Sequence, residues 1–456
     1  METYHFETAL TAEGWKSDVL VRIEGHRIVE VVPEMALPVG ATRLPRIAIP
    51  GIANVHSHAF QRAMAGLVER RGPEEDSFWT WRDVMYRFLA ALSPDDVEAI
   101  AGWLYVEMLE AGFTSVGEFH YVHHAPDGSP YADIGEMAGR IVRAAHATGI
   151  GLTLLPTFYA HGGCGGVAPK PAQRRFVSNL DGFVRLAESA RRHLDQLAEG
   201  QGAIGIAPHS IRAVTPDELA ALLAAFPQGP VHMHAAEQVA EVEECLAWSG
   251  QRPIAWLLDN AGLDARWCLI HATHMTAEET AALARSGAVA GLCPITEANL
   301  GDGVFEAPAF LDAGGRIAVG SDSNVRISLG EELRMLEYGQ RLRDRKRNRV
   351  GPPGSSIGRT LFDATAAGGA RALGRGTGAI AVGMDADIVV LDGEHPVLAG
   401  RRGDAVIDAL VFAGGDGLVS DVIAGGRHMV KEGRHVQRDA LRGRFINVVT
   451  RLASEV

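Results

Sequence analysis

The stretch DDVEAIAGWLYVEMLEAGFTSVGEFH, residues 95–120, joins a helical pattern to a short apolar strand that ends in His120. Apolar residues recur at helical spacing in its first part, whereas residues 112–120 form a compact apolar run that begins with glycine. Further patterns of both kinds, such as the helical PDELAALLAAF at residues 216–226, follow along the chain. This alternation predicts a parallel sheet whose strands are connected by helices.

Eight short apolar runs have the character of strands in such a sheet. They are GIANVHSH (51–58), GFTSVGEFH (112–120), GIGLTLLPTF (149–158), GAIGIAPHS (202–210), GPVHMHAAE (229–237), RWCLIHATH (266–274), GAVAGLCPI (287–295) and GRIAVGSDSN (315–324). Eight βα units in about 320 residues match the size of a (β/α)8 TIM-like barrel. An open, doubly wound sheet is the alternative, but no G-x-G-x-x-G motif follows the first of these strands. We therefore predict an α/β fold with a barrel at residues 50–377.

Both chain ends show a different pattern, of short Val- and Ile-rich runs separated by glycine and charged residues. Residues 1–49 contain YHFETAL and DVLVRIEGHRIVEVV, and residues 378–456 contain GAIAVGMDADIVVLD, DALVFAGG and VSDVIAGGRHMVKEGR. Such runs are typical of small antiparallel strands. Because chain ends often lie close in space, we predict that the two segments together form one small β-sandwich domain.

Composition and charge exclude several classes of function. The 456 residues include 43 Lys and Arg against 56 Asp and Glu, a net charge of −13, so no nucleic-acid partner is expected. No apolar run reaches the length of a membrane span, and the N-terminus has no signal-peptide pattern. The four cysteines are far apart and form no C-x-x-C pair, which fits a reducing compartment. We expect a cytoplasmic protein that binds neither nucleic acid nor membrane.

Histidines and an aspartate stand at the ends of the predicted barrel strands, where such barrels form their active sites. His56 and His58 lie two residues apart on one strand, so their side chains point to the same face. That pair alone could equally be structural. His234, His271 and Asp322 end the fifth, sixth and eighth strands, and in a closed barrel these side chains meet. Three imidazoles and a carboxylate suit zinc or iron(II) with one position open to water, which is a catalytic arrangement.

This set resembles the amidohydrolase superfamily over essentially the whole chain, with His-x-His, two further histidines and an aspartate on matching strands. The fourth strand ends APHS, without the lysine that bridges two ions in the superfamily's two-metal members. The resemblance therefore implies one divalent ion, zinc first and iron as the alternative, as in the deaminase branch. In that branch the ligands correspond to His56, His58, His234 and Asp322. His232 is interpreted as a core histidine or a neighbour of these ligands.

Glu237 follows His234 by three residues and lies at the rim of the same predicted pocket. A lone glutamate there is more often a helix-start carboxylate favoured by the helix dipole. The resemblance instead implies that Glu237 takes a proton from water and passes it to the leaving nitrogen. It further implies that Asp322 orients the attacking water and accepts its proton, and that His271 stabilises that water.

Five separated segments resemble one family of this branch, the formimidoylglutamate deiminases. They are NVHSHAFQRAMAG (54–66), DSFWTWRDVMYRF (76–88), GEFHYVHH (117–124), APHSIRAV (207–214) and CPITEANLGDG (293–303). The last stands where most cyclic-nucleobase deaminases have a Pro-x-Ser-Asn motif. The resemblance implies hydrolysis of N-formimino-L-glutamate to N-formyl-L-glutamate and ammonia, a step of histidine degradation.

That substrate is a small dicarboxylate, so its pocket needs cationic, bidentate donors. Arg212 follows the fourth strand, and Arg82 lies on a long excursion after the first strand that we expect to cover the barrel mouth. The resemblance implies that both bind substrate carboxylates, although lone arginines are more often solvated or ion-paired. It also implies substrate contacts by Gln61, Tyr121 and His209, which alone would be interpreted as helix-start, rim and capping residues.

Two alternatives stay open on the sequence alone. The first is another mononuclear deaminase of the same branch that acts on a neutral ring, such as guanine or an adenosine derivative, and that would not need Arg82 and Arg212. The second is a barrel without catalysis, against which the joint presence of the metal-site residues counts. A related hydrolysis that releases formate would use similar ligands, so only the resemblance assigns ammonia as the leaving group. A homodimer is the expectation from the family.

Overall fold

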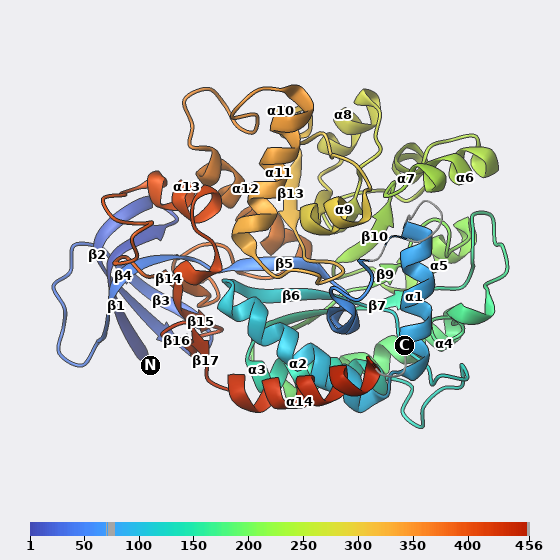
Figure 1. Cartoon of the computed structure of the whole chain (residues 1–456), viewed down its shortest axis with the longest axis horizontal. Coiled ribbons are helices and arrows are strands. Elements are labelled where there is room, and N and C mark those ends of the chain that lie inside the picture. Colours follow the sequence, from blue (N-terminus) through green and yellow to red (C-terminus); the bar gives the residue numbers. More distant parts are fainter. Residues whose placement is uncertain (70, 72–77, 454–456) are drawn as a thin grey trace.

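The computed structural model describes residues 1–69, 71 and 78–453. At its centre, parallel strands follow one another in chain order, with helices outside them (Figure 1). The strands are β5 (Ile52–Ser57), β6 (Phe113–His120), β7 (Gly151–Phe158), β8 (Gly202–Ile204), β9 (Ala207–Pro208), β10 (Val231–Ala235), β11 (Trp267–His271), β12 (Val289–Leu292) and β13 (Arg316–Val319). All eight predicted barrel strands are present, and the fourth is divided into β8 and β9.

The strands pair in two parallel groups that isolated bridges connect. β5, β6, β7 and β8 form one sheet, with β9 paired to β7, and β10 to β13 form the other. The bridge Ser210–His234 links the fourth strand to the fifth, and the bridge Ser57–Asp322 links the segment after β13 back to the first strand. The chain thus has an α/β fold with the TIM-barrel-like curvature predicted from its sequence.

Helices surround this wall of strands. They are α1 (Phe78–Ala91), α2 (Pro94–Glu110), α3 (Glu136–Thr148), α4 (Leu180–His193), α5 (Pro216–Ala225), α6 (Val239–Ser249), α7 (Pro253–Asn260), α8 (Ala277–Ser286), α9 (Pro294–Leu300), α10 (Ala307–Asp312), α11 (Leu329–Asp344) and α12 (Ile357–Leu373), with 3₁₀ turns at Ala59–Met64, Pro171–Gln173 and Leu194–Gln196. Ser93, Thr215 and Thr276 each begin a helix with a capping box, which satisfies the first backbone N–H groups.

Glycine allows two close backbone approaches where the barrel closes. Gly320 follows β13 so close to β5 that a Cβ there would lie 2.7 Å from the backbone nitrogen of His56. Gly368 of α12 faces the carbonyl oxygen of Ile317 in β13, and a Cβ at this position would overlap that oxygen. The bridge between the eighth and first strands therefore depends on Gly320, and the packing of α12 on β13 depends on Gly368.

Strands from both chain ends form one further sheet of eight strands. Its order is β17-β16-β15-β14-β4-β1-β2-β3, formed by β1 (Glu2–Thr11), β2 (Gly14–Glu24), β3 (Arg27–Val32), β4 (Thr42–Pro50), β14 (Ile388–Leu391), β15 (Val419–Ala424), β16 (Arg427–Lys431) and β17 (Arg434–His435). β4 joins the two ends, since it pairs parallel with β1 and antiparallel with β14. The predicted association of the chain ends is thus observed, whereas their division into the two layers of a sandwich stays a prediction.

One predicted strand of this region is wrong. The run DALVFAGG lies largely in helix α13 (Asp404–Phe412), followed by a 3₁₀ turn at Asp416–Leu418. Helix α13 buries five of its residues, from Val406 to Val411, against its neighbours. Because a short, nearly continuous apolar run has no clear period, it fits a buried helix as well as a strand.

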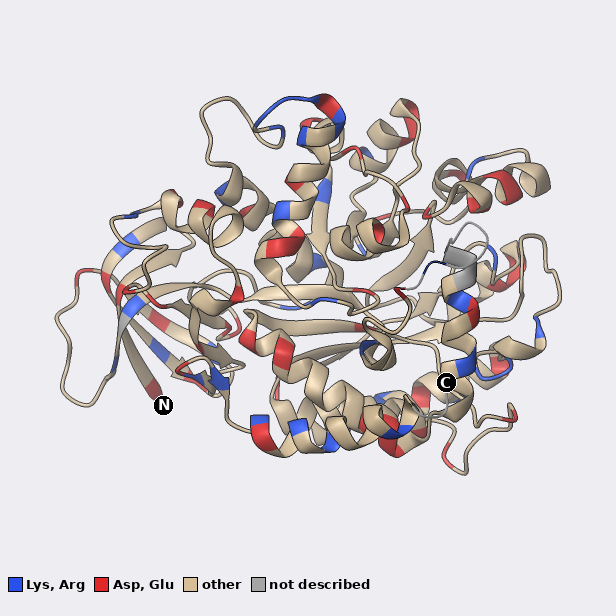
Figure 2. Ribbon diagram, viewed as in Figure 1, with Lys and Arg blue, Asp and Glu red and all other residues tan. Residues whose placement is uncertain are grey.

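The C-terminal helix α14 (Arg438–Leu452) packs along α2, on the outside of the barrel (Figure 1). Acidic and basic residues are interspersed where these two helices lie side by side (Figure 2). Arg444 lies 3.0 Å from Glu98, and Arg451 lies 2.6 Å from Asp96. Within the described residues, no helix combines the length and apolar character that crossing a bilayer requires.

Substitution of Gly368 by alanine tests the close packing of α12 on β13. We expect the variant to lose roughly 1–3 kcal/mol of unfolding free energy, because the new Cβ overlaps a backbone oxygen that cannot move aside alone. Gly443→Ala in α14 is the matched control, since no atom lies within 4 Å of its added Cβ. The control should gain about 0.5–1 kcal/mol from helix propensity. Equal denaturation midpoints for the two variants would contradict this account of the packing.

Candidate active site and metal centre

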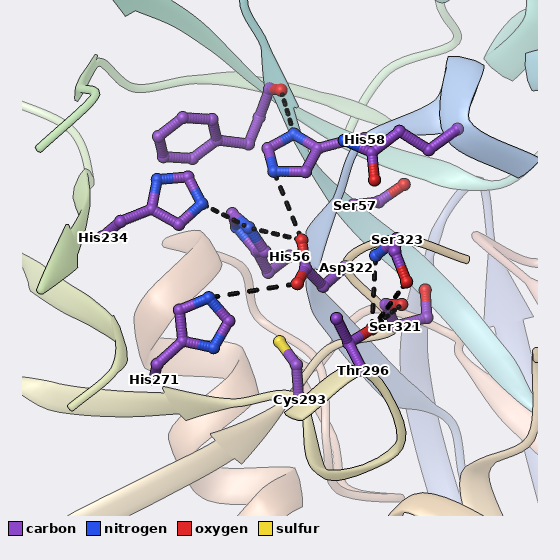
Figure 3. Close-up of polar contacts among 12 residues, drawn as sticks. His56, Ser57, His58, His234, His271, Cys293, Thr296, Ser321, Asp322 and Ser323 are labelled. Carbon is purple, nitrogen blue, oxygen red and sulfur yellow. Dashed lines mark hydrogen bonds and ion pairs between the residues drawn. The ribbon is translucent and has the colours of Figure 1, made fainter. Parts of the chain in front are cut away.

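Four side chains converge at the C-terminal ends of the barrel strands (Figure 3). His56 belongs to β5, His58 follows it directly, His234 belongs to β10, and Asp322 follows β13. Asp322 Oδ1 lies 3.3 Å from the Nε2 atoms of both His56 and His58, and the Nε2 atoms of His56 and His234 are 3.1 Å apart. The candidate ligand atoms of the four residues all lie within 4.8 Å of one another, so they could hold one ion between them.

The protonation of these histidines suits metal binding. The Nδ1 of His58 lies 3.0 Å from the carbonyl oxygen of Phe119, and that of His234 lies 3.0 Å from that of His209. Each ring can donate Nδ1–H to its carbonyl, which leaves Nε2 with a lone pair directed into the cluster. Burial lowers the pKa of His56, His58 and His234, and neighbouring histidines lower it further, while Asp322 and the Phe119 carbonyl partly oppose the shift at His58. The imidazoles are therefore neutral. The donor chemistry therefore fits a divalent ion.

A second group, formed by His271, Cys293 and Asp322, has the same close spacing. Burial holds the pKa of the Cys293 thiol well above its usual value, and nearby carboxylates raise it further. A neutral thiol is a poor metal ligand, since metals bind the thiolate. The group of three histidines and Asp322 is therefore the better metal site.

A buried hydrogen-bond network fixes the segment that contains Asp322. Asn54 donates to the Ser321 hydroxyl at 2.6 Å and accepts from the Ser321 N–H at 3.1 Å, while the same hydroxyl donates to Asn324. Asn324 in turn donates to the carbonyl oxygen of His58 at 3.0 Å. Asp322 and Asn324 have φ values of 45° and 56°, a strained region for residues other than glycine. The network holds that strained turn beside the histidine pair, and no sequence motif indicated it.

Glu118 supports the same pair from β6 and was also not predicted. Its carboxylate accepts from the N–H of Ala59 at 2.7 Å and from the hydroxyl of Tyr105 at 3.2 Å. Burial raises the pKa of Glu118 to about 7, and these hydrogen bonds partly oppose the rise. The residue fixes the backbone immediately after His58.

The predicted acid–base residues lie beside the candidate ligands. His271 Nε2 is 3.6 Å from Glu237 and 3.9 Å from Asp322, while its Nδ1 is 3.3 Å from Glu297. Burial alone would lower the pKa of His271, but Glu237, Glu297 and Asp322 raise it to about 10. Burial raises the pKa of Glu237 to about 7, with the charge of His271 acting in the opposite direction. Glu297 was not predicted, and it orients His271 while it accepts from the N–H of Cys293.

A cavity opens onto this cluster. The predicted site residues that line it are His58, Gln61, Arg82, Tyr121, His209, Arg212, His234, Glu237, His271 and Asp322. The other lining residues, which sequence reasoning did not identify, are Trp81, Met85, Tyr86, Tyr159, Phe176 and Leu300. They are aromatic or apolar residues on α1, at the end of α9 and on connecting segments, and such residues carry no chemical signature before the chain is folded.

The two predicted arginines lie on the same cavity. The Arg212 side chain is 11% exposed, and its Nη2 lies 4.0 Å from Glu241. The charges of Glu241 and Glu237 outweigh burial and raise the pKa of Arg212. The Arg82 guanidinium lies 5.7 Å from the centre of the Tyr86 ring. Arg82 belongs to α1 in the excursion after the first strand, of which residues 72–77 lie outside the described part.

His232 lies on the same strand as His234 but does not belong to the cluster. It is fully buried, and its Nε2 lies 2.7 Å from the carbonyl oxygen of Ala372 in α12. Its interpretation as a core histidine is confirmed.

Comparison with known proteins gives one family and several close relatives. Residues 47–429 match the profile of the Amidohydrolase family. The formimidoylglutamate deiminase of Pseudomonas aeruginosa is 52% identical over 454 residues, which cover 99% of this chain and 100% of the relative. A crystal structure described as an amidohydrolase from Brucella melitensis is 49% identical, with a TM-score of 0.95 and coverage of 99% and 100%. An adenosine deaminase from Xanthomonas campestris, solved with bound zinc, shares the fold at 21% identity, with a TM-score of 0.82 and coverage of 99% and 98%.

Metal content distinguishes the two histidines of β10. We expect the wild-type chain to retain a bound divalent ion through gel filtration and His234→Gln to lose it, because one of three imidazole ligands is gone. His232→Gln is the matched control and should keep the ion, since His232 contacts only the barrel core. Elemental analysis of protein with an intact circular dichroism spectrum provides the measurement. Retention of metal by His234→Gln would show that the ion binds elsewhere.

Proposed function

The chain belongs to the amidohydrolase family, and from this membership we propose that it hydrolyses N-formimino-L-glutamate to N-formyl-L-glutamate and ammonia. The observation that carries the proposal is a single cavity lined by the neutral imidazoles with Asp322, by Glu237 and by two arginines. The curated deiminase of Pseudomonas aeruginosa, similar along nearly the whole chain, supports this substrate. A neutral ring offers no carboxylate to the two guanidinium groups on this cavity, whereas a dicarboxylate does.

In this reaction water adds to the amidine carbon, the bond from that carbon to the terminal nitrogen breaks, and ammonia leaves. We assign to Asp322 the orientation of the attacking water and the acceptance of its proton. Glu237 takes up a proton and delivers it to the departing nitrogen, and His271, within 3.9 Å of both carboxylates, donates a hydrogen bond to the water. With a pKa of about 7, Glu237 can both accept and release a proton near neutrality.

We propose that His56, His58, His234 and Asp322 hold one divalent ion, zinc first and iron as the alternative. Three imidazole nitrogens and one carboxylate oxygen are ligands that both metals accept. When bound, such an ion acidifies water and polarises the substrate. The fourth strand supplies His209 rather than a lysine at this edge, which supports a single ion.

The substrate is a dicarboxylate, and we assign its recognition to Arg82 and Arg212 together with Gln61, Tyr121 and His209. The rings of Tyr121 and His58 are 4.8 Å apart, as are those of His209 and His234, so this polar pair directly adjoins the ligands. Gln61 donates to the Tyr121 hydroxyl at 2.9 Å. Arginines in a water-poor cavity give charge-assisted hydrogen bonds to carboxylates, which the acidic chain as a whole cannot provide.

We further propose a division into a small β domain, at residues 1–49 and 378–456, and a metal-dependent barrel at residues 50–377. The continuous sheet formed by both chain ends supports this division. We propose that the small domain is a two-layered β-sandwich.

A cytoplasmic location is supported by four buried cysteines that form no disulfide bond. A homodimer is supported by an exposed apolar stripe on α11, formed by Met335, Tyr338 and Leu342.

Ammonia release from N-formimino-L-glutamate tests the function directly. We expect release by the metal-loaded protein, with none from guanine or adenosine as neutral-ring controls. Arg82→Met and Arg212→Met should each lower kcat/KM by about 10² or more, because each removes a charge-assisted contact to a carboxylate. Arg185→Met, on the exposed face of α4, is the matched control and should be unaffected. Activity with guanine and none with the formimino substrate would overturn the assignment.

Glu237→Gln separates proton transfer from binding. We expect kcat to fall by about 10²–10⁴, as is usual for loss of a general acid–base group, with little change in KM and in metal content. Glu243→Gln, exposed on helix α6, which begins two residues after Glu237, should retain full kcat. Steady-state kinetics on both variants provide the measurement, and a kcat of Glu237→Gln close to that of the wild type would exclude the proposed role.

A further inference from the structure

Tyr86 and Tyr159 line the wall of the cavity but have no role in the function proposed above. They lie beyond the residues that adjoin the candidate metal ligands. The Tyr159 ring lies 4.7 Å from that of His209, which itself lies 4.8 Å from His234. Tyr86 lies farther along this wall, where Arg82 covers its ring. Ring contacts therefore lead from the candidate ligands through His209 to Tyr159, and from Tyr159 through Phe176 to Tyr86.

Gln173 connects the two tyrosines from behind the wall. Its Nε2 donates to the Tyr159 hydroxyl oxygen at 2.6 Å and to the Tyr86 hydroxyl oxygen at 3.4 Å. Its Oε1 accepts from the backbone N–H of Lys170 at 2.7 Å, which fixes which end of the amide faces the tyrosines. Gln173 is 1% exposed and does not line the cavity, so it acts only through these two rings.

This direction of hydrogen bonding determines what the phenols can do. Each phenol oxygen already accepts from Gln173, so its own O–H remains to be donated elsewhere. Among the described residues, neither hydroxyl donates to an oxygen acceptor. Both side chains line the cavity, so its occupant is the natural acceptor.

The charge at this wall identifies the kind of acceptor. Arg82 and Arg212 act on both phenols, and each favours a negative charge beside them. Two O–H donors next to two guanidinium groups fit a carboxylate, whose oxygens together offer about four acceptor sites. Burial raises the pKa of Tyr159 to about 12 and also raises that of Tyr86, so both remain protonated donors at neutral pH.

We propose that Tyr86 and Tyr159 bind the side-chain carboxylate of the substrate, the one farther from the amidine carbon, and that Gln173 is the positioning residue that directs their O–H groups to it. The proposal rests on the proposed function and adds that the site discriminates between substrates by the length of their side chain. A fixed distal subsite accepts a chain of one length, since a shorter substrate cannot occupy this subsite and the metal centre together. The tyrosines thereby select glutamate derivatives over aspartate derivatives.

The first experiment compares Tyr86→Phe and Tyr159→Phe on two substrates. N-formimino-L-norvaline has a methyl group in place of the distal carboxylate of N-formimino-L-glutamate. Each variant should lose about tenfold in kcat/KM on the glutamate derivative, mainly through KM, and should be unchanged on the norvaline derivative. The preference of the wild type for N-formimino-L-glutamate over N-formimino-L-aspartate should also narrow in both variants. Tyr4→Phe, in β1 of the sheet formed by the chain ends and outside the cavity lining, is the matched control.

The second experiment reverses the hydrogen bonds without changing the size of the side chain. In Gln173→Glu, one carboxylate oxygen can still accept from Lys170 while the other accepts the tyrosine O–H groups and turns them away from the cavity. We expect the same selective loss on the glutamate derivative, with no further loss when Gln173→Glu is combined with both phenylalanine substitutions. Gln196→Glu, in the 3₁₀ turn after α4, controls for the added charge. Thermal unfolding curves confirm that each variant is folded.

The outcomes separate this proposal from the function on which it rests. If the wild type releases no ammonia from N-formimino-L-glutamate, the proposed function fails. If it does, but the tyrosine and Gln173 variants lose activity equally on the glutamate and norvaline derivatives, the tyrosines serve packing and the distal subsite is refuted. A loss of kcat/KM that depends on the carboxylate nearer the amidine, and not on the distal one, would also refute the distal subsite. Only a loss confined to the distal carboxylate supports it.

Discussion

The backbone contact between the segment after β13 and the first strand is the constraint on which the site depends. The N–H of Asp322 donates to the carbonyl oxygen of His56 at 2.9 Å, and the N–H of His58 donates to the carbonyl oxygen of Asp322 at 3.0 Å. These two bonds place the carboxylate beside the histidine pair although they lie at opposite ends of the barrel sequence. They require the absence of a side chain at Gly320, where the strands approach most closely. Closure of the barrel and assembly of the metal centre are therefore the same structural event.

Burying three imidazoles and a carboxylate side by side is unfavourable, and the surrounding residues offset part of that cost. Buried polar groups are tolerated when they are hydrogen-bonded, and here backbone carbonyls bond the His58 and His234 rings. Asn54, Asn324 and Glu118 bond Ser321 and the backbone groups beside these side chains. His271 represents the opposite case, a cation maintained by Glu237 and Glu297. The site thus contains neutral imidazoles that suit a metal and a charged imidazole that suits proton transfer. The burial and the charged neighbours of each ring determine its protonation state.

The sequence predicted those features that depend on local order or on chemically distinctive residues. The eight strands and the histidines at their ends could be identified because strand ends in a parallel barrel converge. The choice of four ligands and the role of Glu237 depended on the resemblance to the deaminase branch. Asn54, Ser321, Asn324, Glu297 and Gln173 could not be identified in this way. Their partners are distant in sequence, and amides, hydroxyls or carboxylates of this kind occur throughout the chain. The helical identity of α13 escaped for a different reason, since burial on several sides removes the polar face that would have shown its period.

In the proposed function, the cavity divides recognition from chemistry. Neutral histidines, Asp322 and Glu237 lie at or just after the strand ends. Of the residues assigned to recognition, Arg82 and Tyr86 belong to α1, a helix inserted between the first and second strands. Because α1 lies outside the hydrogen-bonded barrel, its residues could change without disturbing the ligands. A chain with an overall charge of −13 gains affinity for a dianion only through such local, water-poor groups, since the field of the whole surface opposes it. Substrate selectivity in this fold is therefore expected to depend on α1 and the wall behind it, whereas the reaction type depends on the strand ends.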